Sequence, residues 1–121
     1  MKRLCALRGA IQCRNEEGDI TRRVGELYDA LLEHNDLEEG DIVSLLFSAT
    51  PDIDALNPAA ALRRTGRGTE LALFVLQEAF FPGGPERIIR ALAHCYLAEG
   101  RAPRHIYKNG AEFLRPNWGE T

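Results

Sequence analysis

The sequence predicts an α+β protein in which one mixed β-sheet carries helices on one of its faces. Two segments, residues 3–12 and 42–49, are apolar on both faces of a strand, which is typical of strands covered above and below, and residues 70–76 predict a third strand. Between them, apolar residues recur every three to four positions, as in helices with one buried face. At 121 residues and 45% apolar composition, the chain fits one compact domain, residues 1–121, and not two.

The first strand, residues 3–12, contains one charged residue in an unexpected place. Strand alternation puts Arg8 on the same face as Leu4, Ala6 and Ala10. A guanidinium among apolar groups needs an anionic partner. Arg8 is therefore a candidate for a ligand contact or for a structural ion pair.

The next segment predicts a helix that packs against the sheet. Asp19 can cap it, and its apolar positions recur at helical spacing until it ends near His34 and Asn35. Its charged residues fall mostly on the other side, which indicates a solvated face. A turn at residues 38–41 then leads into the strand at 42–49.

After that strand, turn residues at 50–57 precede a short helix that Pro58 opens and Gly66 closes. The strand at 70–76 runs straight into Gln77 and Glu78. A carboxylate at a strand end is well placed to serve a binding site.

The chain from residue 82 onward predicts a turn followed by a third, long helix. Its buried stripe comprises Ile88, Ile89, Leu92, Ala93, Tyr96 and Leu97. On this helix Arg90 lies at the border between the buried and the wet side, so it is the better candidate than Arg87 for a ligand contact.

The remaining residues predict a β-hairpin and a tail. Short strands at 104–107 and 111–115 flank Asn109 and Gly110, a favoured two-residue hairpin turn. Residues 116–121 are expected to form a loose tail.

A sheet that is apolar on both faces needs a cover on each. One chain of this length supplies helices for only one face, so we expect a second copy of the chain to cover the other.

Composition excludes several classes of function. The 15 basic and 18 acidic residues give a net charge of −3, which argues against nucleic-acid binding. No segment approaches the ~18 consecutive apolar residues of a membrane helix, and no secretory signal pattern begins the chain, so we expect a cytoplasmic protein with no membrane partner. Cys5, Cys13 and Cys95 show no Cys-x-x-Cys spacing and the three histidines are scattered, so neither a disulfide frame nor a metal site is expected.

The charged and polar candidates share one type of chemistry. They comprise Arg8, Arg90 and Glu78, with Arg63 and Tyr107 near the turn segments. The sequence shows neither a nucleophile with its base nor a glycine-rich phosphate loop. These residues therefore predict an arginine-lined pocket for a small carboxylate, with a glutamate that accepts a hydrogen bond from a hydroxyl.

Four segments carry a resemblance to a known family. They are LRGAI at 7–11, LFSATPDIDALNPAAALRR at 46–64, LQEAFFPGGPERIIR at 76–90, and HIYKNGAEFLRP at 105–116. In order and spacing the chain resembles the monofunctional chorismate mutases of the trimeric α/β-barrel type.

The resemblance implies a pseudo-α/β-barrel homotrimer with active sites in clefts between adjacent subunits. The reaction it implies is the pericyclic rearrangement of chorismate to prephenate, on the route to phenylalanine and tyrosine. That reaction needs no cofactor, no metal and no covalent intermediate, which is consistent with the missing nucleophile.

The resemblance also implies roles for individual residues. Arg90 would donate to the ether oxygen and a carboxylate, Arg8 would pair with a carboxylate, and Glu78 would accept from the ring hydroxyl. Tyr107 would donate to a carboxylate, and Arg63 would attract the dianion at the entrance. Wall or backbone contacts would come from Leu114, Ala59, Leu73 and Phe74.

Three positions depart from the family pattern. Asn57 stands where an aromatic residue is common, Ala60 where a lysine is common, and Val75 where a cysteine is common. Without a lysine at position 60, the rim is expected to attract the dianion less strongly.

Two other functions stay open on the sequence alone. One is a non-catalytic trimeric module that binds a small carboxylate at its subunit clefts. The other is an enamine or imine hydrolase of similar trimeric architecture.

Overall fold

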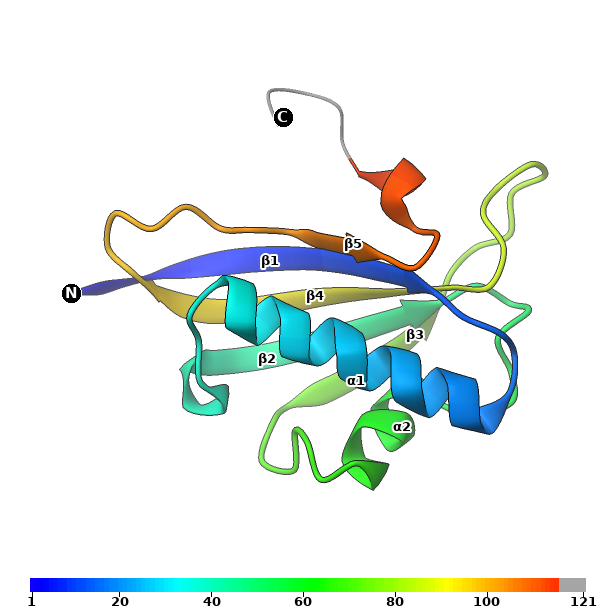
Figure 1. Cartoon of the computed structure of the whole chain (residues 1–121), viewed down its shortest axis with the longest axis horizontal. Coiled ribbons are helices and arrows are strands. Elements are labelled where there is room, and N and C mark those ends of the chain that lie inside the picture. Colours follow the sequence, from blue (N-terminus) through cyan, green and yellow to red (C-terminus); the bar gives the residue numbers. More distant parts are fainter. Residues whose placement is uncertain (116–121) are drawn as a thin grey trace.

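The computed structural model describes residues 1–115 as one five-stranded sheet with two helices against a single face (Figure 1). The predicted tail at 116–121 lies outside the described residues. In chain order the elements are β1 (Lys2–Gln12), α1 (Glu17–His34), β2 (Ile42–Ala49), α2 (Pro58–Arg64), β3 (Leu73–Gln77), β4 (Ile88–Ala98) and β5 (Ile106–Lys108), with short 3-10 turns at Glu39–Asp41 and Glu112–Leu114.

The sheet is mixed, as the sequence predicts. Its strand order is β3-β2-β4-β1-β5. Strand β4 runs antiparallel to both of its neighbours, β1 and β2, whereas the outer strands β3 and β5 pair in parallel with β2 and β1. The central position of β4 means that its side chains meet those of β1 and β2 on either side.

The core lies between the sheet and α1. Alternate residues of β1 and β2, such as Leu7, Ile11 and Phe47, are at most 2% exposed. The helix presents its predicted apolar stripe to them, with Ile20, Val24, Leu27 and Leu31 buried. Both helices pack on this face, so the prediction of helices on one side is confirmed (Figure 1).

The predicted third helix is wrong: residues 88–98 form strand β4. The apolar residues in this segment fit a helical stripe and also fit alternation, in which Ile89, Ala91 and Ala93 face the core. Pairing on both sides, with β1 and with β2, decides in favour of the strand. Arg90 therefore projects from a strand in the middle of the sheet rather than from the border of a helix.

Three smaller predictions are also corrected. The predicted strand at 111–115 is a 3-10 turn, because β5 pairs in parallel with β1 and does not form a hairpin, although Asn109 and Gly110 have the positive φ values of a tight turn. The third strand begins at Leu73 rather than residue 70. Asp19 is the third residue of α1 and not its N-cap; its carboxylate accepts from the backbone N–H of Arg14.

The other face of the sheet, hereafter the helix-free face, carries large apolar side chains that this chain does not cover. Their exposed fractions are 58% for Leu4, 60% for Phe74, 49% for Leu76 and 44% for Tyr96. Isolated exposed apolar residues are ordinary, but a group on one sheet face marks an interaction surface. The predicted cover, a second copy of the chain, stays a prediction.

Asn35 fixes the end of α1 to the segment that leads into β5. It is fully buried; its amide donates to the carbonyls of Leu31 and Arg104 and accepts from the N–H of Arg104. Through these bonds one side chain sets where β5 begins, and thereby where Tyr107 lies.

We expect Asn35→Ala to lower the free energy of unfolding by about 2 kcal/mol, because it leaves buried backbone groups without partners. Asn15→Ala is the matched control. Asn15 also makes three hydrogen bonds, to Asp54 and Ala55, but is exposed, so water replaces them and the loss should stay below about 1 kcal/mol. Urea unfolding measures both; equal losses would contradict the role given to burial.

Candidate active site

Five of the predicted site residues lie at one end of the helix-free face: Arg8, Glu78, Arg90, Tyr107 and Leu114. Strand register aligns Ser48 of β2 with Arg90 of β4, Arg90 with Ala10 of β1, and Ala10 with Tyr107 of β5. Residues aligned in register point to the same face. Arg8, two positions before Ala10, shares that face.

A cleft of about 310 Å³ lies at this end of the face. Arg8, Arg90 and Tyr107 supply its polar groups, and Leu114 reaches it from the 3-10 turn after β5. Ser48 of β2 also lines the cleft, and the rest of the wall is apolar, including Leu46, Leu76 and Leu92 from β2, β3 and β4. A small cleft with two guanidiniums and an apolar wall suits a compact organic anion.

Glu78 holds Arg90 in place. The Arg90 Nε donates to Glu78 Oε2 at 2.9 Å, and the Ser48 hydroxyl donates to the same oxygen at 2.7 Å. The glutamate side chain is only 18% exposed, against 41% for the arginine. Because Glu78 engages the inner nitrogen, this ion pair does not use the two terminal nitrogens of the guanidinium fork.

Glu78 lines a second, larger cavity of about 730 Å³, and Arg90 lines both this cavity and the smaller cleft. Its other side is the loop before β4, where Phe80 and Phe81 are 75% and 69% exposed. The ion pair therefore lies between two hollows. Among the predicted charged residues, Arg8 faces only the smaller one.

Ser48, which donates to Glu78, is not among the residues that the sequence predicts for the site. Alternation along β2 places Ser48 on the helix-free face, but its position opposite Arg90 follows from the β2–β4 register, which required β4 to be a strand.

The backbone around Arg8 is held by His105. The N–H of Arg8 donates to His105 Nδ1 at 3.0 Å, which joins β1 to the segment before β5. Partial burial, and secondarily the charge of Arg8, lower the pKa of His105 from its ordinary value of 6.5. Both effects favour the neutral ring, which is the form that can accept this hydrogen bond.

The other four predicted residues lie away from this cleft. Ala59 and Arg63 belong to α2, which packs on the opposite face of the sheet, and Leu73 and Phe74 belong to the edge strand β3. Ala59 is buried and Arg63 is exposed. These four residues line neither of the two hollows around Arg90.

Two of the three departures from the family pattern, Asn57 and Val75, have different structural settings. Asn57 is the N-cap of α2, where its side-chain oxygen accepts from the N–H groups of Ala59 and Ala60. Capping by asparagine stabilises a helix start, which an aromatic residue cannot do. Val75 is half-buried on β3 and packs against the core.

The structure offers no metal ligands in the part of the chain that it describes: residues 1–115 bring no three His, Cys, Asp or Glu side chains together. Over the same residues, no helix combines the length and the apolar character needed to cross a membrane.

We expect acidification to destabilise the protein through His105. Its pKa is lowered in the folded state, so the unfolded chain binds more protons; the stability that the neutral ring contributes is complete above about pH 6.5 and is lost as the pH falls below that value. Asparagine can accept the Arg8 N–H without titrating. Urea unfolding at pH 7.5 and 5.5 should show a smaller loss for His105→Asn than for the wild type, whereas the control His34→Asn should respond as the wild type does.

Comparison with known proteins identifies the family. The model of the family "Chorismate mutase type I" matches residues 4–118. Chorismate mutase AroH of Bacillus subtilis (strain 168) is 30% identical over 117 residues, covering 95% of this chain and 92% of that protein. Its counterpart from Thermus thermophilus is 30% identical over 115 residues, covering 92% and 93%.

A solved structure agrees with these relatives. The chorismate mutase from Clostridium thermocellum superposes with a TM-score of 0.82 at 36% identity, and the match covers 91% of this chain and 99% of that one. The shared fold extends over both the sheet and its helices. The chain belongs to the chorismate mutase type I family.

Proposed function

We propose that this chorismate mutase binds chorismate in the cleft between Arg8, Arg90 and Tyr107 and converts it there to prephenate. The observation that carries this proposal is the pair of guanidiniums on one apolar-walled cleft, one of them anchored by Glu78. The reaction belongs to aromatic amino acid biosynthesis. It is intramolecular, so the proposal includes no cofactor.

The substrate is a flexible dianion with two carboxylates. Arg8 pairs with one carboxylate and Tyr107 donates a hydrogen bond to a carboxylate. Such contacts hold the substrate in the compact conformer in which the reacting carbons approach one another. Positioning of this kind can contribute several kcal/mol, up to about 7–11, to lowering the barrier.

Arg90 acts on the transition state. As the ether C–O bond breaks, negative charge grows on the oxygen, and the guanidinium fork donates to that oxygen and to a carboxylate. A donor already aimed at developing charge is worth about 3–4 kcal/mol. An acceleration of ~10⁶ needs roughly 8 kcal/mol, so Arg90 and positioning together are of the required size.

Glu78 has two tasks in this arrangement. Its Oε2 accepts hydrogen bonds from Arg90 Nε, which orients the arginine, and from the Ser48 hydroxyl. Its other oxygen, Oε1, accepts from the ring hydroxyl of the substrate. Ser48 is a positioning residue, because it acts on Glu78 and not on the substrate.

The rest of the site comes from a neighbouring copy in a homotrimer. The exposed apolar residues of the helix-free face support assembly through this face. In the proposed trimer, Arg63 of one copy lies at the entrance to the cleft of the next copy. Ala59 of the first copy, together with Leu73 and Phe74 of its edge strand β3, completes the wall of that cleft. This arrangement explains why these residues lie away from Arg90 within one chain.

We propose the cytoplasm as the compartment. The three cysteines are buried free thiols, which is typical of a reducing environment.

The chorismate assay separates this function from a carboxylate-binding module and from an enamine or imine hydrolase. Loss of chorismate absorbance with prephenate as sole product is expected for the wild type. Binding without turnover, or hydrolysis of an imine, would contradict the proposal.

We expect Arg90→Lys to lower kcat at least ~10²-fold, about 3 kcal/mol, because lysine keeps the charge but loses the fork. Arg90→Ala should lose more. Arg64→Lys is the control, since Arg64 is an exposed arginine paired with Glu17 on the helix side of the sheet. Near-normal turnover by Arg90→Lys would remove Arg90 from the proposed role.

The shared site can be tested by mixing two inactive variants. Arg90→Ala removes the cleft donor, and Arg63→Glu repels the dianion at the entrance. If each site combines residues from two copies, unfolding and refolding the variants together creates some sites with both arginines intact. Activity of the mixture above the sum of the separate variants is expected; simple additivity would show that each cleft is complete within one chain.

A further inference from the structure

A second cluster of arginines lies beside the start of α1, on the helix side of the sheet. Four of them, Arg14, Arg22, Arg23 and Arg87, line a recess of about 410 Å³. Its remaining lining is Gln12, Cys13, Asp19, Asn109 and Gly110. None of these residues lines the cleft around Arg90.

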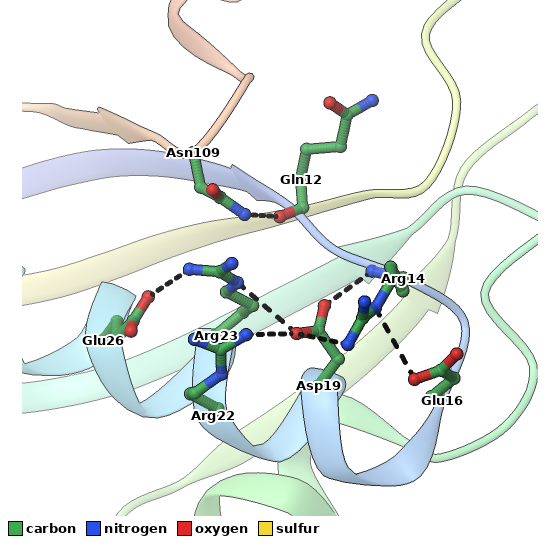
Figure 2. Close-up of polar contacts among 8 residues, drawn as sticks. All are labelled: Gln12, Arg14, Glu16, Asp19, Arg22, Arg23, Glu26 and Asn109. Atoms are coloured by element: carbon green, nitrogen blue, oxygen red, sulfur yellow. Dashed lines mark hydrogen bonds and ion pairs between the residues drawn. The ribbon is translucent and has the colours of Figure 1, made fainter.

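One buried carboxylate faces this cluster. Asp19 has a side chain that is 3% exposed; its Oδ2 accepts the Arg14 N–H and its Oδ1 accepts from Arg22 at 2.8 Å. Figure 2 shows the guanidiniums of Arg14, Arg22 and Arg23 grouped around it. Burial opposes ionisation of Asp19, but these hydrogen bonds and nearby arginines lower its pKa below the ordinary value, so it is charged.

Asp19 cannot satisfy all the arginines. The Nε of Arg23 is buried and lacks a hydrogen-bond acceptor among the described residues, with Asp19 Oδ1 at 3.6 Å. The guanidinium Nη2 of Arg14 lies 4.0 Å from Asp19 Oδ1, which is beyond hydrogen-bond distance. A buried donor without an acceptor is costly, so the protein's own acceptors leave the arginines of the recess incompletely satisfied.

The charge inside the recess is positive. Its lining contains four arginines and one aspartate, a formal charge of 4 − 1 = +3. Glu16, Glu26 and Glu86 contact Arg14, Arg23 and Arg87, but these glutamates do not line the recess. Their side chains are 37–71% exposed and those of Arg14, Arg22 and Arg87 are 43–70% exposed, so solvent screens these outer charges of both signs, whereas Asp19 and Arg23 are more buried.

The arginines come from separate parts of the chain. Arg14 lies between β1 and α1, Arg22 and Arg23 lie on α1, and Arg87 directly precedes β4. Asp52 accepts the backbone N–H of Arg87 at 3.0 Å through both oxygens, which fixes the point where that side chain leaves the backbone. Asn109 adds an amide from the loop after β5, held by the carbonyl of Gln12 (Figure 2).

We propose that this recess binds a compact oxyanion with two negative charges. Guanidiniums from three segments suit several oxygens on one small centre, which is the geometry of a phosphate or of a compact dicarboxylate. Bound there, the anion links the start of α1 to the start of β4 and adds an acceptor close to Arg23.

Calorimetric titration with inorganic phosphate at pH 7.5 tests the proposal, with sodium chloride of equal ionic strength as the reference. We expect Arg22→Gln to weaken phosphate binding about tenfold, the size of one lost charge-assisted hydrogen bond. Arg64→Gln is the matched control: it removes an arginine of similar exposure that pairs with Glu17, outside the recess, and binding should persist. Chorismate turnover in phosphate-free buffer should stay at the wild-type level in Arg22→Gln.

Arg87→Gln is the second variant, in case Arg22→Gln disturbs Asp19; it leaves the contacts of that carboxylate intact and should also weaken binding. Arg90→Ala separates this site from the catalytic cleft and should bind phosphate as the wild type does. Sodium malonate, a compact dicarboxylate, distinguishes a carboxylate ligand from a phosphate in the same titration. No binding beyond the ionic-strength reference would overturn the proposal. Binding that Arg90→Ala abolishes and Arg22→Gln and Arg87→Gln preserve would overturn it as well.

Discussion

The ion pair between Arg90 and Glu78 is the interaction on which the proposed site depends. It joins the centre of the sheet to the end of the edge strand β3, and Ser48 fixes it from the strand between them. A free arginine side chain samples many rotamers, and holding it at the moment of reaction costs entropy. Because Glu78 holds the inner nitrogen, the arginine side chain loses this entropy when the protein folds. The fork is then already oriented when substrate binds.

The sheet separates two kinds of chemistry by its two faces. The helix side holds the buried core, in which aliphatic residues predominate beside Phe47 and Tyr28. The helix-free side keeps Arg8, Arg90 and Tyr107 beside the exposed apolar residue Leu76, and Phe74 is exposed on the same face. If a second copy covers these apolar groups, as we propose, it also removes water from around the arginines. Exclusion of water strengthens their interaction with a dianion.

The two arginine clusters are close along the chain but differ in character. Arg87 and Arg90 are three residues apart, and Asn109 follows Tyr107 by two, so the same strand ends contribute to the recess and to the cleft. Beside the cleft, Glu78 at the end of the edge strand β3 engages Arg90. In the recess, Asp19 is buried among three arginines and cannot satisfy them all. The recess therefore suits an added anion for reasons of local charge, independent of the reaction.

The sequence by itself determined the fold class, the helices on one face and the strands at β1 and β2, and it predicted the residues of the proposed site, because these follow from local periodicity and from the four family segments. Only the tertiary structure decided that residues 88–98 form a strand: their apolar pattern fits both periods, and pairing with two neighbours selects one. The same pairing aligned Ser48 with Arg90, which no local pattern encodes. It also separated Ala59 and Arg63 from the cleft, because α2 packs on the opposite face. Register and layer are properties of contacts between distant segments, so they appear only when the chain is folded.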